Sequence, residues 1–292
     1  MGRRQAQLTA LQTASMRAQN YIFIVVFIFL NNFSFAQESE KVFGVYEPIK
    51  KGEKVYVFEE KCALKAQANL SSKTLMEIPL GEALTLETDY LIKESLRVTN
   101  PPFIKVQFRG KTGYVRSSSL AFEKLVYEKE ETSFLFQLNS PKDTIHKITI
   151  KEVYANKTVL NEVKEPLPAE SFSIYLSDNK GLTDVEKLLI IDFYAEACGM
   201  NGGIAYYSWS PSKLALIANL VALFDADVYA KEEKLIFPTD EGGKDGTVLF
   251  YSETHELVDE ATEWMNKTVV TRTYQWKDGA LLPSFDAPAE TE

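Results

Sequence analysis

The sequence predicts a mainly β protein, with a small β-barrel followed by a larger β-rich domain that forms an antiparallel sheet or sandwich. Three observations support this fold class. Short segments in which apolar and polar residues alternate, the period of a strand, recur from about residue 53 to residue 276. Clusters of Gly, Asp and Pro separate these segments and mark turns. The 292 residues suffice for one large or two modest domains.

Residues 1–36 are typical of a targeting signal. The segment has a basic region with three arginines, Arg3, Arg4 and Arg17. A continuous apolar run follows from Tyr21 to Leu30, and Ser34-Phe35-Ala36 offers a cleavage point before Gln37. The run is shorter than the roughly 20 residues that span a bilayer, which favours a removed signal over an uncleaved anchor. With Met1 or Met16 as the start, we expect an exported protein, periplasmic or extracellular, without a membrane span after signal removal.

The charge balance excludes one class of partner. The formal net charge is −9, and removal of the three arginines of residues 1–36 makes it −12. Such an acidic body repels the phosphate backbone, so we expect no nucleic-acid partner.

Residues 37–52 are polar and mixed, and we expect a linker or an entry strand there. Strands are then predicted within residues 53–122, at 55–57, 75–80, 83–88, 104–108 and 112–115. The last two form a hairpin around Arg109-Gly110-Lys111, where Gly110 suits a turn position with positive φ. A long polar connection is expected at 89–102.

The order of these pieces resembles the bacterial SH3-like (SH3b) domain over about residues 53–122, close to a quarter of the chain. The matching segments are Val55-Tyr56-Val57, Ala63-Leu64-Lys65-Ala66, Ser71-Ser72-Lys73, Ile78 to Glu82 and, most specifically, the hairpin Lys105 to Val115. The family usually has an Asn-apolar-Arg triplet where this chain has Ala63-Leu64-Lys65, and often a Trp where it has Phe103-Ile104. The resemblance implies a module that binds cell-wall peptidoglycan or acts as a spacer beside another domain.

The charged residues 123–132 are expected to form a linker before a β-rich domain of unknown family at 133–285. The continuous apolar run of 188–194 predicts a strand buried on both faces. Segment 214–224 fits a helix or a strand, and 253–266 a short helix or a polar hairpin. Repeated strand–turn–strand units faintly resemble propeller blades, but the length favours a sheet or sandwich. The tail 286–292 is acidic and is expected to be disordered.

The two cysteines, Cys62 and Cys198, leave two alternatives open. An oxidising compartment permits a disulfide between them, whereas free cysteines commonly act as small buried hydrophobes, which is the favoured interpretation. Cys198 and His255 also suggest a cell-wall cysteine peptidase as an alternative function. That alternative is disfavoured, because Cys198 follows an apolar strand and does not begin a helix, where the dipole lowers the thiol pKa.

Metal and cofactor chemistry is not indicated by the sequence. His146 and His255 are the only histidines and no Cys-x-x-Cys occurs, so no zinc site is predicted. The loop 240–246 and the pair Asp225 and Asp227 lack the ligand spacing of a calcium site, and ordinary turns are favoured. We expect no cofactor.

Exposed aromatic residues are the remaining binding candidates. Tyr56, Phe103 and Tyr114 are predicted to flank a groove of the barrel, because aromatic faces stack on sugars and on prolines. The alternative is that at least two of them pack in the core or at its rim. The sequence thus favours an exported, non-enzymatic binding or accessory protein, with cell-wall glycan or peptide, or an envelope protein, as its partner.

Overall fold

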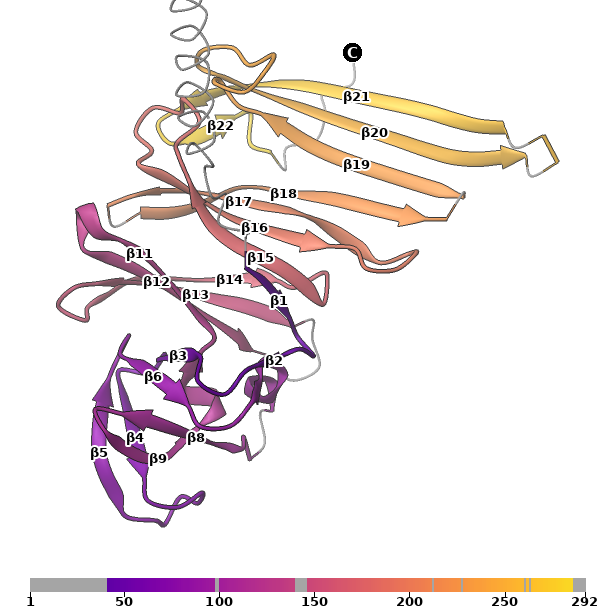
Figure 1. The fold of residues 1–292 in the computed structure, drawn as a ribbon. Helices are drawn as coiled ribbons and strands as arrows, with labels where there is room; N and C mark the ends of the chain where they lie inside the picture. The colour runs from indigo at the N-terminus through magenta and orange to yellow at the C-terminus, as the bar shows by residue number, and fades with distance from the viewer. Residues whose placement is uncertain are drawn as a thin grey trace, which may run out of the picture. The chain divides into compact units, whose positions relative to one another are not determined.

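The computed structural model describes residues 41–97, 100–139, 146–211, 213–226, 228–259, 261–262 and 264–285. These residues are mainly β and form four antiparallel sheets, which confirms the predicted fold class (Figure 1). The expected signal 1–36, the tail 286–292 and Asp227 lie outside the described residues. In the part of the chain that is described, no helix is long and apolar enough to cross a membrane.

A seven-stranded sheet covers residues 54–121, within the region for which the sequence predicts an SH3-like module. Its order is β10-β3-β6-β8-β9-β4-β5, and no pairing between the described strands joins β10 to β5. The strands are β3 (Lys54–Val57), β4 (Lys61–Lys65), β5 (Thr74–Pro79), β6 (Ala83–Leu86), β8 (Phe103–Phe108), β9 (Lys111–Arg116) and β10 (Leu120–Ala121). Alternate residues of these strands point into one core, among them Val55, Leu84 and Val106.

The β8–β9 hairpin forms at the predicted place. Arg109 and Gly110 occupy its turn with φ of 47° and 77°, so the expected positive φ of Gly110 is confirmed. Gly113 serves another purpose in β9, because a Cβ there would lie 2.7 Å from Leu64 Cγ and from Lys65 O. The missing side chain of Gly113 thus lets β4 approach β9 closely.

Several short elements lie outside the strands predicted within residues 53–122. In the expected linker or entry strand, β1 (Val42–Gly44) pairs with β15 and β2 (Pro48–Ile49) pairs with β7 (Tyr90–Leu91). The expected polar connection 89–102 holds β7 and a 3-10 helix, η1 (Ile92–Leu96), and Tyr90 is 1% exposed. The remaining 3-10 helices are η2 (Ser117–Ser119) and η3 (Glu128–Glu130).

The predicted linker 123–132 is wrong for a physical reason. Residues Glu123–Tyr127 form β11, which pairs with β12. Leu125 and Tyr127 pack against the core, whereas on the opposite face Val126 is exposed and Lys124 is half-buried, with its Nζ donating to Gly81 O. The charged residues in and after this segment therefore led to the prediction of a linker where a strand forms.

Two further sheets follow as meanders. The four-stranded sheet contains β11, β12 (Thr132–Asn139), β13 (Lys147–Tyr154) and β14 (Val159–Pro166). The nine-stranded sheet has the order β1-β15-β16-β17-β18-β19-β20-β21-β22, with β15 (Ser171–Ser177), β16 (Lys187–Tyr194), β17 (Asn201–Ser210), β18 (Lys213–Asp225), β19 (Tyr229–Ile236), β20 (Thr247–Asp259), β21 (Trp264–Lys277) and β22 (Ala280–Leu282). The repeated strand–turn–strand units are thus consecutive strands of one sheet, not propeller blades.

The ambiguous segments of this region all become strands. The apolar run 188–194 lies in β16, whose Leu189 and Ile191 belong to one hydrophobic cluster and whose Leu188 and Ile190 belong to another. A strand buried on both faces is therefore confirmed. Segment 214–224 lies in β18, and 253–266 forms parts of β20 and β21.

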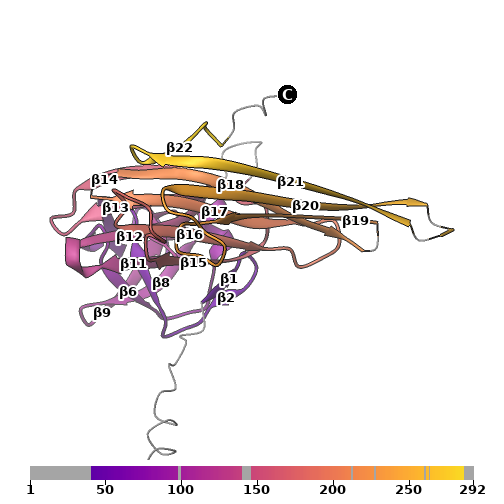
Figure 2. The same cartoon turned by 90° about the horizontal axis from the view of Figure 1, so that it is seen from above.

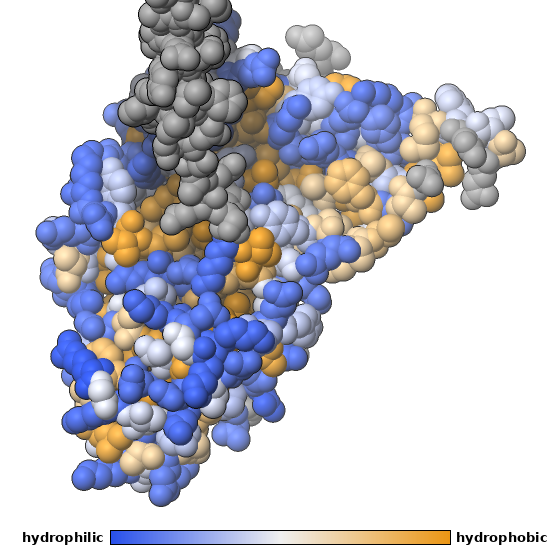
Figure 3. Space-filling model, viewed as in Figure 1, coloured by the Kyte–Doolittle hydropathy of each residue, from blue (hydrophilic) through white to orange (hydrophobic). Residues whose placement is uncertain are grey.

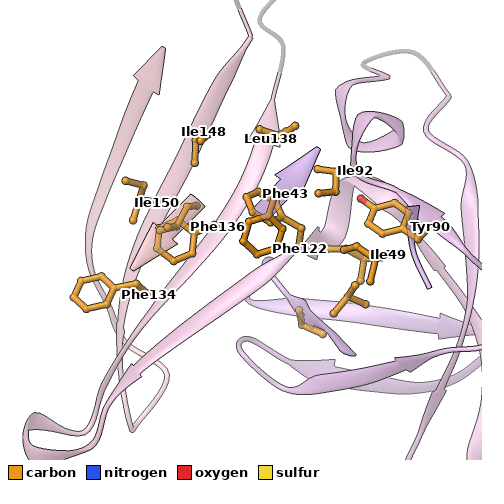
Figure 4. Packing of buried hydrophobic residues seen from close by; sticks show 14 of the residues in the cluster. Phe43, Ile49, Tyr90, Ile92, Phe122, Phe134, Phe136, Leu138, Ile148 and Ile150 are labelled. Atoms are coloured by element: carbon orange, nitrogen blue, oxygen red, sulfur yellow. The ribbon is translucent and has the colours of Figure 1, made fainter. Parts of the chain in front are cut away.

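One hydrophobic cluster continues through the seven-, four- and nine-stranded sheets. Phe43 and Phe122 lie side by side in this cluster (Figure 4), with ring centroids 5.1 Å apart. The ring centroid of Phe172 is 5.8 Å from that of Phe43 and 5.7 Å from that of Phe122. Residues 40–292 accordingly form one compact unit. Neither a linker nor a break in the core marks the predicted boundary between two domains.

Candidate binding surface

The outer face of the β8–β9 hairpin gathers aromatic and basic side chains. Ile104 and Val106 point into the core from β8, so the alternate residues Phe103 and Lys105 face outward. Val115 is buried in β9, and its neighbours Tyr114 and Arg116 face outward in the same way. Two aromatic rings and two cations therefore share one surface.

The strand register adds a third cation and sets the spacing. Tyr114 pairs with Lys105 on β8 and with Lys65 on β4, while Phe103 pairs with Arg116. Directly opposite residues have Cβ atoms about 4.5–5.5 Å apart, so the tyrosine ring lies between two lysines. We call this surface the aromatic–basic face, formed by five half-buried residues: Lys65, Phe103, Lys105, Tyr114 and Arg116.

The cations of this face are not neutralised by ion pairs. Among the described residues, no ion pair involves Lys65, Lys105 or Arg116, although Lys65 Nζ donates to Ser72 O at 3.2 Å and to Thr74 Oγ1 at 3.0 Å. An acid lies at the margin, since Glu87 donates its N–H to Lys105 O at 2.9 Å. The aromatic–basic face therefore carries a net positive charge, although the protein as a whole is acidic.

The space-filling view puts the seven-stranded sheet in context. On the side that Figure 3 shows, hydrophilic residues cover most of the surface over this sheet, with scattered hydrophobic ones between them. This part of the molecule therefore has a hydrophilic surface, on which isolated aromatic side chains can contact a ligand.

The structure places the three predicted aromatic residues differently. Phe103 and Tyr114 lie together on the aromatic–basic face. Tyr56, on β3, instead packs against a small cluster that includes Leu135 and Val153 of the four-stranded sheet. Burial, and secondly the charge of Glu123, raises the pKa of Tyr56. Tyr56 is thus a packing residue, and no local signal in the sequence reveals which sheet covers it.

Both cysteines are free, so the possible Cys62–Cys198 disulfide does not form. Cys62 is buried in β4, where desolvation raises its thiol pKa to about 12. Cys198 is exposed in the connection between β16 and β17 of another sheet. The favoured interpretation, two buried thiols, is correct for Cys62 alone.

Cys198 and His255, the residues of the alternative peptidase, are not brought together. Gly199 N–H donates to Phe224 O at 2.8 Å, Phe224 pairs with Ala230, and Ala230 pairs with His255. Three inter-strand steps separate the two backbones, about 14 Å, far beyond the hydrogen-bond reach that a nucleophile and its base require.

His255 belongs instead to a charged cluster on β20 and β21. Its Nε2 lies 2.6 Å from Glu253 Oε1, Lys267 Nζ lies 2.7 Å from the same oxygen, and the Tyr251 hydroxyl also donates to Glu253. Lys267 first, and then Tyr251 and His255, lower the pKa of Glu253 to about 2. Three members of the cluster, Tyr251, Glu253 and His255, line a shallow depression of about 280 Å³ together with Phe224, Ala230, Glu232 and Lys234.

The structure also contains a cavity that was not predicted from the sequence. A mainly apolar cavity of about 230 Å³ lies between β14 and β18, with Glu165 and Asn219 among its lining residues. Glu165 is 3% exposed and accepts a hydrogen bond from the Tyr207 hydroxyl. Burial raises the pKa of this carboxyl. The burial of Glu165 could not be predicted from the sequence, because it depends on the contact between Glu165 of β14 and Tyr207 of β17.

In the loop 240–246, which was considered as a calcium site, the first acidic residue, Asp240, stabilises the turn. Asp240 accepts the backbone N–H of Phe237 at 2.9 Å and pairs with Lys180 at 2.9 Å. Asp240 therefore closes the β19–β20 connection as a turn residue. Among the described residues, no group of three or more His, Cys, Asp or Glu side chains is placed to hold a metal ion.

Two comparisons with known proteins, one with protein families and one with curated proteins, gave no match. No protein-family model matches the sequence, and no curated protein is significantly similar to it. The function is therefore argued from the surfaces described above.

Proposed function

We propose that this chain is an exported, non-enzymatic binding or accessory protein whose seven-stranded sheet is an SH3b-like module that contacts cell-wall peptidoglycan. The observation that carries the proposal is the aromatic–basic face, where Tyr114 lies between Lys65 and Lys105, and Arg116 lies opposite Phe103. Peptidoglycan offers the matching chemistry, because its sugar rings stack on aromatic side chains and its peptide carboxylates pair with cations.

Two further observations support a binding role over catalysis. The cations of the face have no ion-pair partner among the described residues, so their charge is available to an anionic ligand. The Cys198–His255 pair of the alternative peptidase is separated by two strands, and Cys198 is exposed in a connection between strands. Export remains a proposal that rests on residues 1–36.

The test is co-sedimentation of the chain from residue 37 with purified sacculi, with release of soluble muropeptides measured in the same samples. We expect pelleting without release. Tyr114→Ala and Lys105→Glu should each weaken pelleting about tenfold, because a lost stacking ring or a reversed charge costs on the order of 1–2 kcal/mol.

The matched control is Tyr46→Ala, which removes another surface aromatic, 55% exposed, that lies outside the face. Its pelleting should equal that of the unchanged chain. Equal loss in both variants would remove the aromatic–basic face from the proposal. Absence of pelleting altogether would shift the partner to an envelope protein, and release of muropeptides would restore the hydrolase alternative.

A further inference from the structure

The outer strand of the nine-stranded sheet is paired on one side only. The strand β21 has 14 residues and pairs with β20 along almost its whole length. On its other side, β22 covers only Gln275–Lys277. Figures 1 and 2 both show β21 beyond β20 and reaching far past the short β22. Residues 265–274 therefore form a long edge, although most natural sheets end in short or covered strands.

The register identifies the backbone groups of this edge. Trp276 N–H donates to Gly246 O at 2.9 Å, on the β20 side of the strand. Successive residues of a strand alternate in the direction of their N–H and C=O groups, so the even-numbered residues of β21 point toward β20. The odd-numbered residues between the β20–β21 turn and β22 point outward: Met265, Lys267, Val269, Thr271 and Thr273. No backbone hydrogen bond outside the strand ladders reaches these outward groups from another described residue.

The side chains of the edge favour an added strand. Thr268, Val269, Val270 and Thr271 are β-branched residues, which fit pleated sheets well, and Val269 and Val270 are 46% and 40% exposed. The strand carries Lys267, Arg272 and Lys277 and no acid. Lys267 already pairs with Glu253 of β20 at 2.7 Å, but its ammonium group has further donors for a second carboxylate. An extended segment with acidic side chains would complement this charge, because opposite charges on neighbouring strands attract.

A second copy of the chain fits the edge less well. Pairing β21 with its own copy would add the same lysine and arginine side chains and no carboxylate to neutralise them. Cations on an edge are a known protection against this kind of self-association. The positive charge of β21 thus favours pairing with an acidic partner over pairing with a second copy of the chain.

We propose that the outer edge of β21 binds an extended acidic segment of a partner protein as an additional antiparallel strand, with its carboxylates opposite Lys267 and Arg272. Main-chain hydrogen bonds to the five outward residues would supply affinity, and the two cations would supply specificity. This site is independent of the aromatic–basic face, and it would allow an accessory protein to hold a second component.

The probe is a fluorescent peptide as long as segment 265–273, made of Thr and Val, with glutamate at the two positions that would pair with Lys267 and Arg272. We expect it to bind the chain from residue 37 in an anisotropy titration. A matched peptide with lysine at both positions should bind about tenfold more weakly, because two attractive pairs become repulsive. The double variant Lys267→Glu/Arg272→Glu should reverse this preference.

A backbone variant distinguishes strand addition from simple charge attraction. Val269→Pro removes an outward N–H and should abolish binding with little loss of stability, since edge strands tolerate proline where the N–H faces solvent. Val269→Thr keeps that N–H and should bind as the unchanged chain does. Thr271→Pro repeats the test if Val269→Pro unfolds.

Three outcomes would overturn the proposal. The first is absence of binding by the glutamate peptide, and the second is unchanged binding by a folded proline variant. The third is a concentration-dependent dimer in sedimentation that Val269→Pro abolishes, because it would identify a second copy of the chain as the occupant of the edge.

Discussion

Trp209 and Glu152 connect the four-stranded and nine-stranded sheets through a hydrogen bond with both side chains fully buried. The indole Nε1 donates to Glu152 Oε1 at 2.8 Å, and the indole ring packs edge-on against Tyr127 and Phe134. Asn161 Nδ2 donates to the other carboxylate oxygen at 2.5 Å. A buried carboxylate that loses one of its donors keeps the desolvation cost and loses part of the compensation.

We therefore expect Trp209→Phe to lower the free energy of unfolding by about 2–4 kcal/mol, from the lost donor and the smaller ring. Chemical denaturation measures the change. The matched control is Trp264→Phe, because Trp264 is 59% exposed and its replacement should cost less than about 0.5 kcal/mol. Equal effects of the two substitutions would contradict a structural role for the Glu152 bond.

Glu165 is a second buried carboxyl and has a testable pH signature. Burial raises its pKa above the usual value of 4.5, so the folded chain holds this proton to a higher pH than the unfolded chain does. Its contribution to stability is fully present below pH 4.5 and is lost as the pH rises through the folded pKa. Glu165→Gln keeps the shape of the side chain and removes this loss.

The melting temperature of Glu165→Gln should therefore exceed that of the unchanged chain by an amount that grows as the pH rises above about 4.5. Thermal unfolding over a series of pH values measures it. A difference that stays constant with pH would mean that Glu165 does not titrate with a raised pKa.

At the scale of elements, two glycines of the β8–β9 hairpin are needed for different reasons, Gly110 for its backbone conformation in the turn and Gly113 for close packing in β9. Gly110 has φ of 77° and open space around a built Cβ, so Gly110→Ala should cost only the left-handed backbone, about 1–2 kcal/mol. At Gly113 a Cβ would meet Leu64 and the Lys65 carbonyl at 2.7 Å, and β4 must move away.

Gly113→Ala should therefore be the more destabilising of the two substitutions. It should also weaken sacculus binding at temperatures where the variant is folded, because it separates Lys65 from Tyr114. Denaturation and pelleting measured on both variants test this. A smaller cost at Gly113 than at Gly110 would contradict the close approach of β4 to β9.

The β20–β21 hairpin carries its own electrostatic signature. Glu253 has a pKa of about 2, against the usual 4.5, chiefly because Lys267 donates to it. Its interactions stabilise the fold above pH 4.5, and this contribution is lost as the pH falls through about 2. Lys267→Gln should return the pKa of Glu253 part of the way to 4.5, as observed by NMR titration of its side-chain carboxyl. An unchanged titration would assign the low pKa to Tyr251 and His255.

Sequence patterns predicted those elements whose signal is local. The β8–β9 hairpin follows from alternation around Arg109-Gly110, and β16 follows from an apolar run that only a doubly buried strand accommodates. The strand β11 was not predicted because the charged residues Glu123 and Lys124 and the charged run from Glu128 to Glu131 flank its three apolar residues, as in a linker. Of the aromatic–basic face, the sequence predicted Phe103 and Tyr114. Lys65 and the covered position of Tyr56 depend on strand pairing and on a sheet formed later in the chain.

For the whole molecule, the central question is whether residues 40–292 behave as one domain or two. The SH3-like module predicted from the sequence for residues 53–122 would be an autonomous unit. The core indicates the opposite, because β1 crosses to pair with β15, and Phe43 and Phe122 pack on Phe172 of that strand. Gln137 Nε2 also donates to Ser118 O and Leu120 O, which fastens the end of the seven-stranded sheet to β12. A module joined in this way cannot unfold without exposing part of the common core.

We expect a single cooperative unfolding transition, and the chain contains a natural pair of probes. Its three tryptophans, Trp209, Trp264 and Trp276, all lie in the nine-stranded sheet, whereas the buried thiol of Cys62 reports on the seven-stranded sheet. In a Cys198→Ser background, tryptophan fluorescence and Cys62 labelling should follow the same denaturant midpoint. Phe122→Ala should lower both midpoints together, by about 3–5 kcal/mol of unfolding free energy. Labelling of Cys62 at a lower denaturant concentration than the fluorescence change would mean that the seven-stranded sheet opens alone, and the shared aromatic cluster would then be a weak contact between two domains.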